Sequence, residues 1–125
     1  MSEKKKKVAL IGWNPKVVDY RKWPGLTAEK VTAGLKADRD RLNSLGYEAS
    51  LLLINDEVSA FDAVRTALQA QAYDGVMIGA GVRLDPEYLI LFERLINAVH
   101  EAAPQAKICF NTNPQDTAKA VQRWV

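Results

Sequence analysis

The sequence predicts an α/β domain with three layers, in which a doubly wound parallel sheet of four strands lies between helices. Three observations support this fold class. Short apolar runs alternate four times with longer segments that have helical spacing. The run Gly75–Ile78 is apolar throughout, which is typical of a strand buried on both faces of a parallel sheet. Turn residues separate each run from the helix that follows it.

The first expected strand, Val8–Ile11, is followed by an unusually long connection to the next helix. The segment from 14 to 25 carries Trp13, Tyr20 and Trp23 within it or beside it, with charged residues between the aromatic ones. Loops of this length in a small domain are often functional. The alternative is that these aromatic side chains cap the edge of the sheet.

The first helix is expected from about residue 28 to 45, with Thr27 as its N-cap and Gly46 just after its end. Val31, Leu35, Leu42 and Leu45 form one apolar stripe, and Asp38 interrupts it. Such a break in the pattern indicates either a functional residue or a specially paired one. We favour a structural role, either as a partly buried aspartate that pairs with a neighbouring arginine, lysine or hydroxyl group or as one tilted out to water.

The second strand is expected from residue 47 to 54, and the next helix runs to about Ala72. Ser59 and Asp62 have the spacing of a capping box at its start. This helix directs Phe61, Val64 and Leu68 inward, as their spacing indicates.

The third strand, at 75–78, leads into Gly79, Gly81 and Arg83, which we expect on a loop. Asp85 and Pro86 then have the form of an N-cap and a first helical residue, and the helix runs to about Ala103. Apolar residues cover more than one face of this helix, so part of it is expected to pack on a second subunit.

The fourth strand is expected at 107–110, and Asn113 with Pro114 begins the last helix, in which Asp116 suits the helix dipole. Right-handed crossovers then give the strand order 2-1-3-4, as in a flavodoxin-like sheet that lacks its fifth strand. The fourth strand becomes an exposed edge, which invites pairing. Together with the apolar third helix, this edge predicts a homodimer.

Composition restricts the class of protein. The 125 residues suffice for a single domain, 1–125, of which 1–7 is expected to be a flexible basic terminus. The alternative for Lys4–Lys7 is a nucleic-acid or membrane-surface patch, but we favour a solvated terminus before the first strand and expect no nucleic-acid partner. The net charge of +2 argues neither for nor against such a partner. A single cysteine excludes an internal disulfide, and no apolar segment is long enough to span a membrane. We expect a cytoplasmic protein.

Polar and aromatic residues gather where the predicted strand order reverses, which is the usual place for a ligand in such sheets. The crevice would be lined by the ends of all four strands: Trp13, Asn14, Asp56, Gly79, Gly81, Arg83, Asn111 and Thr112. Arg83 would pair with an anion, and the loop that carries Trp23 would close over it. The alternative for Arg83 is a surface salt bridge to Asp19, Asp85 or Glu87. The pattern predicts a site for a small polar or anionic ligand.

Specific catalytic and cofactor signatures are absent from the sequence. There is no Walker loop, and Gly79–Gly81 is only part of a dinucleotide fingerprint and follows the wrong strand. His100 and Cys109 lack the partner spacing of metal ligands, so we expect neither a metal nor a cofactor. Asp56 or Asp19 could serve as a base, but no residue pair requires it. The sequence leaves open whether the chain is an enzyme.

The order of elements, and Tyr73–Ile78 in particular, resembles the receiver domains of response regulators. Receivers carry an acidic pair after the first strand, where this chain has Gly12 and Trp13. They carry a phospho-accepting aspartate after the third strand, where this chain has Gly79. Thr112 matches the hydroxyl position of receivers, but their fifth strand and its lysine are absent. The resemblance therefore implies the receiver shape without aspartyl phosphorylation.

Three further motifs resemble those of a small family of uncharacterised bacterial proteins. They are the Pro-Gly-Leu-Thr-Ala-Glu-Lys start at 24–30, the Gly-Ala-Gly-Val-Arg turn at 79–83 and the Cys-Phe-Asn-Thr strand end at 109–112. This resemblance spans nearly the whole chain and implies a flavodoxin-like domain, but it implies no activity.

Two functional hypotheses follow from the sequence. In the first, the domain binds a small polar or anionic molecule at the carboxyl edge of the sheet. In the second, the domain is a dimeric interaction or signalling module of receiver-like shape without catalytic activity, and its third and fourth helices carry the function.

Overall fold

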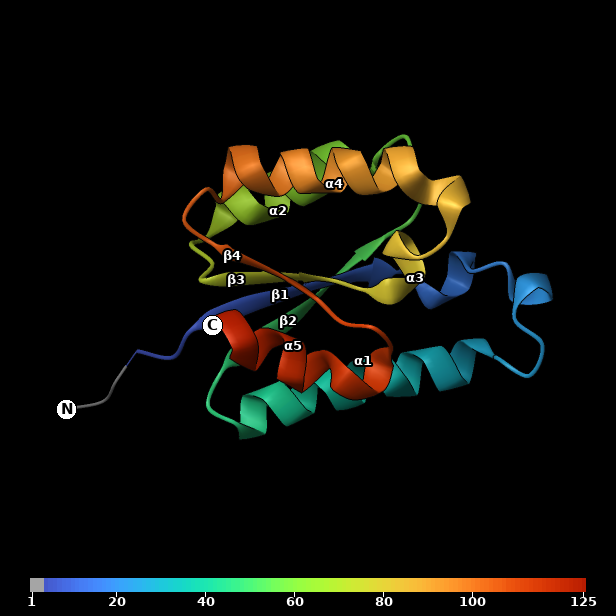
Figure 1. Ribbon diagram of the computed structural model, residues 1–125, viewed down its shortest axis with the longest axis horizontal. Coiled ribbons are helices and arrows are strands. Elements are labelled where there is room, and N and C mark those ends of the chain that lie inside the picture. The colour runs from blue at the N-terminus through green and yellow to red at the C-terminus, as the bar shows by residue number, and fades with distance from the viewer. Residues whose placement is uncertain (1–3) are drawn as a thin grey trace.

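The computed structural model describes residues 4–125 and shows one sheet with helices on both faces (Figure 1). All strands run parallel, in the order β2-β1-β3-β4. Their bounds are β1 (Lys7–Trp13), β2 (Glu48–Ile54), β3 (Gly75–Ile78) and β4 (Lys107–Phe110). This arrangement confirms the predicted α/β class and the flavodoxin-like strand order 2-1-3-4.

Helices cover both faces of the sheet (Figure 1). α1 (Ala28–Ser44) and α5 (Thr117–Trp124) lie on one face, while α2 (Ala60–Ala70) and α4 (Leu89–Ala102) lie on the other. Shorter helical turns connect the strands to these helices. They are η1 (Pro15–Val17), η2 (Tyr20–Lys22), α3 (Ala80–Arg83), η3 (Pro86–Tyr88) and η4 (Pro114–Asp116).

The strands divide their side chains between two apolar layers. Ile11, Val76 and Ile78 point toward α2 and α4, whereas Leu10 and Met77 point toward α1 and α5. This division follows from the two-residue period of a strand. The central strands are buried on both faces, as the apolar sequence of Gly75–Ile78 predicts. Cys109 is a buried free thiol in the second layer, and burial raises the pKa of this thiol.

The connection from β3 to α4 differs from the prediction. Arg83 does not lie on a loop, because the chain after Gly79 closes one turn of helix, α3. Asp85 does not begin the long helix either. Its carboxylate accepts the Glu87 N–H at 3.0 Å and caps η3, and α4 begins only at Leu89. Asp85 and Pro86 therefore do form an N-cap and a first helical residue, but those of the short turn η3 that precedes α4.

Two predictions about helix ends are wrong. Ser59 forms no capping box with Asp62, because the Ser59 hydroxyl and N–H both donate to Asp56. Leu45 lies after the end of α1 and is 44% exposed, whereas Leu42 of the same predicted stripe is fully buried. α1 ends at Ser44, and the chain reverses at Gly46, whose φ of +98° places it in the left-handed region.

The basic terminus is shorter than predicted. Lys7 is the first residue of β1, and its N–H donates to the Asp74 carboxylate at 2.9 Å. Lys4 to Lys6 precede the strand, and residues 1–3 of the predicted terminus lie outside the described residues. Within residues 4–125, no helix has the length and apolar character that a membrane span requires.

Candidate functional site

The carboxyl ends of β1 and β3 meet where the strand order reverses, and Trp13 joins them. Its indole Nε1–H donates to the Gly81 carbonyl oxygen at 3.3 Å. The indole ring also packs on Tyr88, with ring centroids 5.1 Å apart. Trp13 therefore holds α3 and η3 against the end of β1, and its ring is part of the packing of this edge.

Asn111, directly after β4, is a buried polar residue at this edge whose amide is bonded on both sides. It is only 4% exposed. Its Oδ1 accepts the Ala80 N–H at 2.8 Å, and its Nδ2 donates to Thr117 Oγ1 at 2.9 Å. The side chain thus caps α3 on one side and binds the first residue of α5 on the other, so its polar atoms are engaged within the protein.

Arg83 lies over the end of β4. Its Nη2 donates to the Asn111 carbonyl oxygen, and its guanidinium carbon is 5.2 Å from the centre of the Phe110 ring. Nε is buried and, within the described residues, has no hydrogen-bond partner. The alternative of a salt bridge to Asp19, Asp85 or Glu87 is wrong, because Lys22 bonds Asp85 and Glu87, and Arg21 bonds Asp19.

A chain of hydrogen bonds continues from Asn111 through Thr117 to α1. Thr117 Oγ1 donates to the Asp38 carboxylate at 3.0 Å. Burial raises the pKa of Asp38, while the hydrogen bond from Thr117 acts in the opposite direction and the nearby charge of Asp116 raises the pKa further. The prediction that Asp38 is partly buried and paired with a hydroxyl group is confirmed, and its role here is to join α1 to α5.

Thr112 is bound to the carboxylate of Asp116. Thr112 Oγ1 donates at 2.6 Å, and the N–H groups of Thr112 and Asn113 donate at 2.9 and 3.2 Å. These bonds, with that of the threonine hydroxyl first, lower the pKa of Asp116. Asn113 and Asp116 form a capping box on η4, and α5 begins at Thr117.

The predicted residues on the β2 side form local turns. Asn14 Nδ2 donates to Asn55 Oδ1 at 2.9 Å, and Asn14 Oδ1 accepts the Lys16 N–H at 3.0 Å. Asp56 Oδ1 accepts the Ser59 N–H at 2.7 Å and the Ser59 hydroxyl at 2.9 Å. These polar groups connect the turns that follow β1 and β2.

The two carboxylates considered as general bases are weak bases in this fold. Hydrogen bonds from Ser59 lower the pKa of Asp56, and hydrogen bonds from Arg21 lower the pKa of Asp19. A general base works best when its pKa lies near the working pH, and these shifts move both groups further from neutrality. The geometry therefore supplies no argument for acid–base catalysis at this edge.

The long connection between β1 and α1 is attached to η3 through Lys22. Its Nζ lies 2.5 Å from Glu87 Oε2 and 3.5 Å from Asp85 Oδ2, and 5.3 Å from the centre of the Tyr88 ring. The hydrogen bond to Glu87 raises the pKa of Lys22. Trp23, the next residue, is 50% exposed. Trp23 therefore lies half exposed at the surface, and closure of its loop over a ligand stays a prediction.

The structure brings together Trp13, Gly79, Gly81, Arg83 and Asn111, and it places Asn14 and Asp56 in separate turns. Sequence reasoning missed Thr117 and Lys22. Thr117 directly follows a capping box, and no sequence pattern at that position indicates a buried hydrogen-bonding role. Lys22 is one of many lysines in the sequence, and no pattern distinguishes it from the others. Within residues 4–125, no group of three or more His, Cys, Asp or Glu residues is placed to hold a metal ion.

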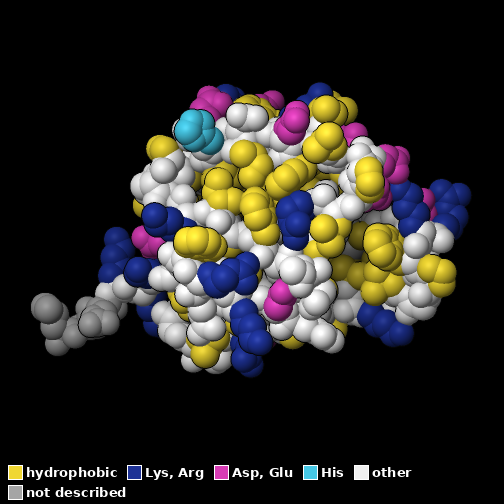
Figure 2. Space-filling model, viewed as in Figure 1, with side chains coloured by type: hydrophobic (Ala, Val, Ile, Leu, Met, Phe, Trp, Pro, Cys, Tyr) yellow, Lys and Arg dark blue, Asp and Glu magenta, His cyan; other side chains and the backbone are white. Residues whose placement is uncertain are grey.

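A second surface lies where β4 forms the edge of the sheet. Figure 2 shows hydrophobic side chains gathered there, below α4 on the face that is turned to the viewer. The half-buried side chains of Phe92 and Ile96 from α4 and of Ile108 and Phe110 from β4 border this edge, and we call them the β4–α4 face. The rings of Phe92 and Phe110 pack edge to face, 5.6 Å apart.

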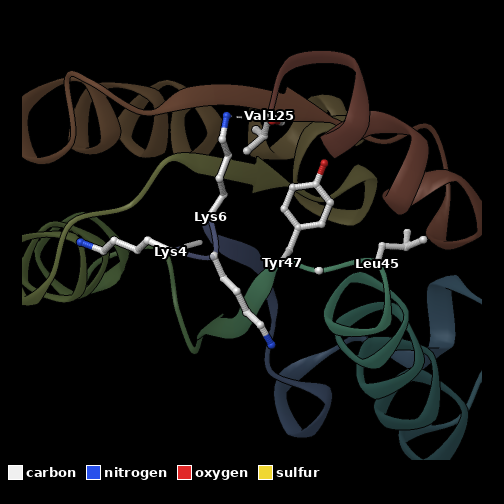
Figure 3. Close-up of a pocket in the computed structure, with 7 residues that line it drawn as sticks. Lys4, Lys6, Leu45, Tyr47 and Val125 are labelled. Atoms are coloured by element: carbon white, nitrogen blue, oxygen red, sulfur yellow. Dashed lines mark hydrogen bonds between the residues drawn. The ribbon is translucent and has the colours of Figure 1, made fainter. Parts of the chain in front are cut away.

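A hollow at the opposite end of the sheet is bordered by lysines (Figure 3). Its lining residues are Lys4, Lys5, Lys6, Leu45, Gly46, Tyr47 and Val125. Lys6 reaches across to the Val125 carbonyl oxygen at 3.3 Å, whereas Lys4 points away from Tyr47 in Figure 3. These ammonium groups diverge, so they form no convergent binding site for a single anion.

Comparisons with known proteins do not assign this chain to a family. No family model matches the chain, and no curated protein has a significant match to it. The resemblances to receiver domains and to the small bacterial family therefore stay predictions.

Proposed function

We propose that this domain is an interaction module that pairs with a second copy of itself through the β4–α4 face. The observation that carries the proposal is the open edge of β4, bordered by half-buried apolar side chains. The candidate residues at the switch point, in contrast, bind one another. This favours the interaction hypothesis over the ligand hypothesis.

Backbone groups at the β4 edge support a contact there. The Lys107 N–H donates to the Asp74 carbonyl oxygen at 3.0 Å, so Lys107 and Cys109 turn their backbone groups toward β3. Ile108 and Phe110 consequently turn theirs outward. Arg123 Nη2 covers the Phe110 carbonyl oxygen at 2.9 Å. The outward backbone of Ile108 is left for water or for a partner.

Charged residues restrict how this edge can pair. Lys107 and Arg123 are exposed at its two ends, and β4 has only four residues. Lysines and short length are features that prevent open-ended strand pairing. A closed dimer related by a two-fold axis is compatible with both the charged ends and the short strand. In such a dimer the apolar side chains meet at the axis, and the charged residues stay at the rim of the contact.

The apolar stripe of α4 extends the face. Leu89, Phe92 and Ile96 follow one another at helical spacing, and Leu89 is 55% exposed. In a two-fold pair this stripe would be covered by the same stripe of the partner. Apolar area of this kind is the main source of association free energy.

The test is the molar mass in solution, measured by light scattering after size exclusion over a range of concentrations. The wild-type chain should approach twice its monomer mass of 13.9 kDa as concentration rises. Leu89→Glu and Phe92→Glu should keep the chain at the monomer mass, because each places a charge in the apolar contact.

The matched control is Ile90→Glu. Ile90 is 56% exposed on the same helix but points away from β4, so this variant should pair like the wild type. Circular dichroism checks that every variant is folded. A wild-type chain that stays monomeric at all concentrations contradicts the proposal, as does a Leu89→Glu variant that pairs normally.

A small anionic ligand at the switch point is the second candidate, and one observation favours it. Arg83 Nε is buried without a partner in the described part of the chain, so an anion or a water molecule that reached it would gain a hydrogen bond. A thermal-shift screen with sugar phosphates, nucleotides and small carboxylates tests this candidate. Arg83→Ala should abolish any stabilising response, and a response unchanged by Arg83→Ala would exclude this site.

A further inference from the structure

A narrow groove lies at the other edge of the sheet, between β2, α1 and η1. It has a volume of about 230 Å³. Leu51 and Leu53 from β2 and Leu35 from α1 supply aliphatic side chains, and the whole lining consists of Asn14, Pro15, Lys16, Thr32, Leu35, Lys36, Leu51 and Leu53. This set combines an apolar floor with polar and cationic groups.

Both charged residues of the groove are lysines. Lys16 and Lys36 come from different elements, η1 and α1, and both are exposed. Among residues 4–125 neither ammonium group forms an ion pair, and no acidic side chain lines the groove. Arg21 and Lys22, in the connection between β1 and α1, are in contrast paired with acids. The groove therefore has a positive charge that its own residues do not balance.

The free edge of β2 adds backbone donors. The Glu48 N–H donates to Lys6 and the Ile54 carbonyl accepts from Asn14, which shows that the even-numbered residues from 48 to 54 turn toward β1. Leu51 and Leu53 therefore turn their N–H groups outward, at the side of the groove. An anionic oxygen near either N–H would gain a hydrogen bond that is assisted by charge.

We infer that this groove binds a small amphipathic carboxylate, with its hydrocarbon part on the three leucines and its carboxylate between Lys16 and Lys36. Three features of the groove fit this chemistry. The apolar floor takes up a short alkyl chain or a ring, the unbalanced cations attract one negative charge, and the volume is that of a molecule of fragment size. The groove is independent of the β4–α4 face, since β2 and β4 are opposite edges of the sheet.

The test is a titration of the ¹⁵N-labelled chain with hexanoate, followed by amide chemical shifts. Hexan-1-ol serves as the neutral analogue with the same chain, and acetate as the anion without the chain. Hexanoate should give saturable shifts at Lys16, Leu51 and Leu53, and its Kd should be about tenfold lower than that of either analogue, which corresponds to about 1.4 kcal/mol.

Charge removal separates this site from general attraction of anions. Lys16→Gln combined with Lys36→Gln should raise the hexanoate Kd about tenfold, a loss of about 1.4 kcal/mol of binding free energy. The Kd for hexan-1-ol should stay unchanged. The matched control is Lys119→Gln, an exposed lysine on α5 outside the groove, which should change neither value.

Three results would overturn the inference. The first is hexan-1-ol binding as tightly as hexanoate, which would leave the lysines without a role. The second is a set of shifts that does not saturate or that spreads over the lysine-rich surface. The third is hexanoate binding that survives the double lysine substitution unchanged.

Discussion

At the scale of single residues, Asn111 holds the switch point together. Its side chain binds α3 through Ala80 and α5 through Thr117, and its carbonyl oxygen accepts from Arg83. Buried amides with all their polar groups bonded fix the position of the elements around them. A residue that we expected to orient a ligand therefore orients the protein itself.

Replacing Asn111 with alanine should lower the free energy of unfolding by about 3 kcal/mol, because the half-buried Ala80 N–H loses its acceptor and the buried Thr117 hydroxyl loses its donor. Urea denaturation measures this change. Asn97→Ala is the control, because Asn97 is exposed on α4 and bonds only the Glu93 carbonyl within the described residues, and its effect should be within about 0.5 kcal/mol. Equal effects of the two substitutions would show that the Asn111 bonds do not determine stability.

The Asp38 carboxylate should make stability depend on pH. Burial raises its pKa in the folded state, so the folded protein holds a proton that the unfolded chain releases above a pH of about 3.9. The contribution of the Asp38 carboxyl group to the free energy of unfolding is therefore fully present below that pH. It is lost as the pH rises through the raised pKa of the folded state.

Asp38→Asn removes this dependence and can still accept the hydrogen bond from Thr117. The variant should gain stability over the wild type as the pH rises from acid toward neutral, and urea denaturation at several pH values measures the difference. Asp116→Asn should behave in the opposite way, because hydrogen bonds lower the pKa of Asp116 and the wild-type advantage disappears as the pH falls. The same sign for both variants would contradict the two assigned environments.

At the scale of elements, the sequence predicts the strands and long helices well. Strand β3 begins and ends at the predicted residues, and α1 begins after its predicted cap, Thr27. These elements are specified by patterns within a few residues of one another. The one-turn helix α3 was missed because it is stabilised by Asn111, which follows it by about thirty residues and whose partnership no local pattern reveals.

Two glycines, one inside α1 and one just after it, offer a matched test of how the sequence sets the length of this helix. Gly46, after the helix, has a φ of +98°, so Gly46→Ala should lower stability by about 1 kcal/mol. Gly34 lies inside the helix, where an added Cβ meets nothing within 4 Å, so Gly34→Ala should raise stability by about 0.5 to 1 kcal/mol. Thermal unfolding followed by circular dichroism compares them. Destabilisation by Gly34→Ala would show that its surroundings are tighter than this structure indicates.

At the scale of the whole molecule, the sheet has two open edges with different surroundings. β4 is bordered by aromatic and aliphatic side chains, and β2 is bordered by a leucine-lined groove with two lysines that form no ion pair among residues 4–125. The two edges therefore suit different partners, a second copy of the chain at β4 and a small anion at β2. Both proposals follow from the absence of a fifth strand and of any covering element at these edges in the described residues.

The candidate site could be predicted only in part. The position of the switch point followed from strand order alone, and Trp13, Arg83 and Asn111 do meet there. Their roles could not be predicted, because a side chain that binds a ligand and one that binds the backbone of its own protein have the same sequence pattern. The groove beside β2 was not predicted, since Leu35, Leu51 and Lys16 come from three separate elements.

The most direct test of the proposed pairing is an isotope-filtered nuclear Overhauser experiment on a mixture of labelled and unlabelled chains. It detects contacts between two copies and ignores contacts within one. Our account predicts intermolecular signals among the Ile96 and Ile108 methyl groups and the rings of Phe92 and Phe110. Intermolecular signals confined to another surface, or none at concentrations where the mass is doubled, would contradict it.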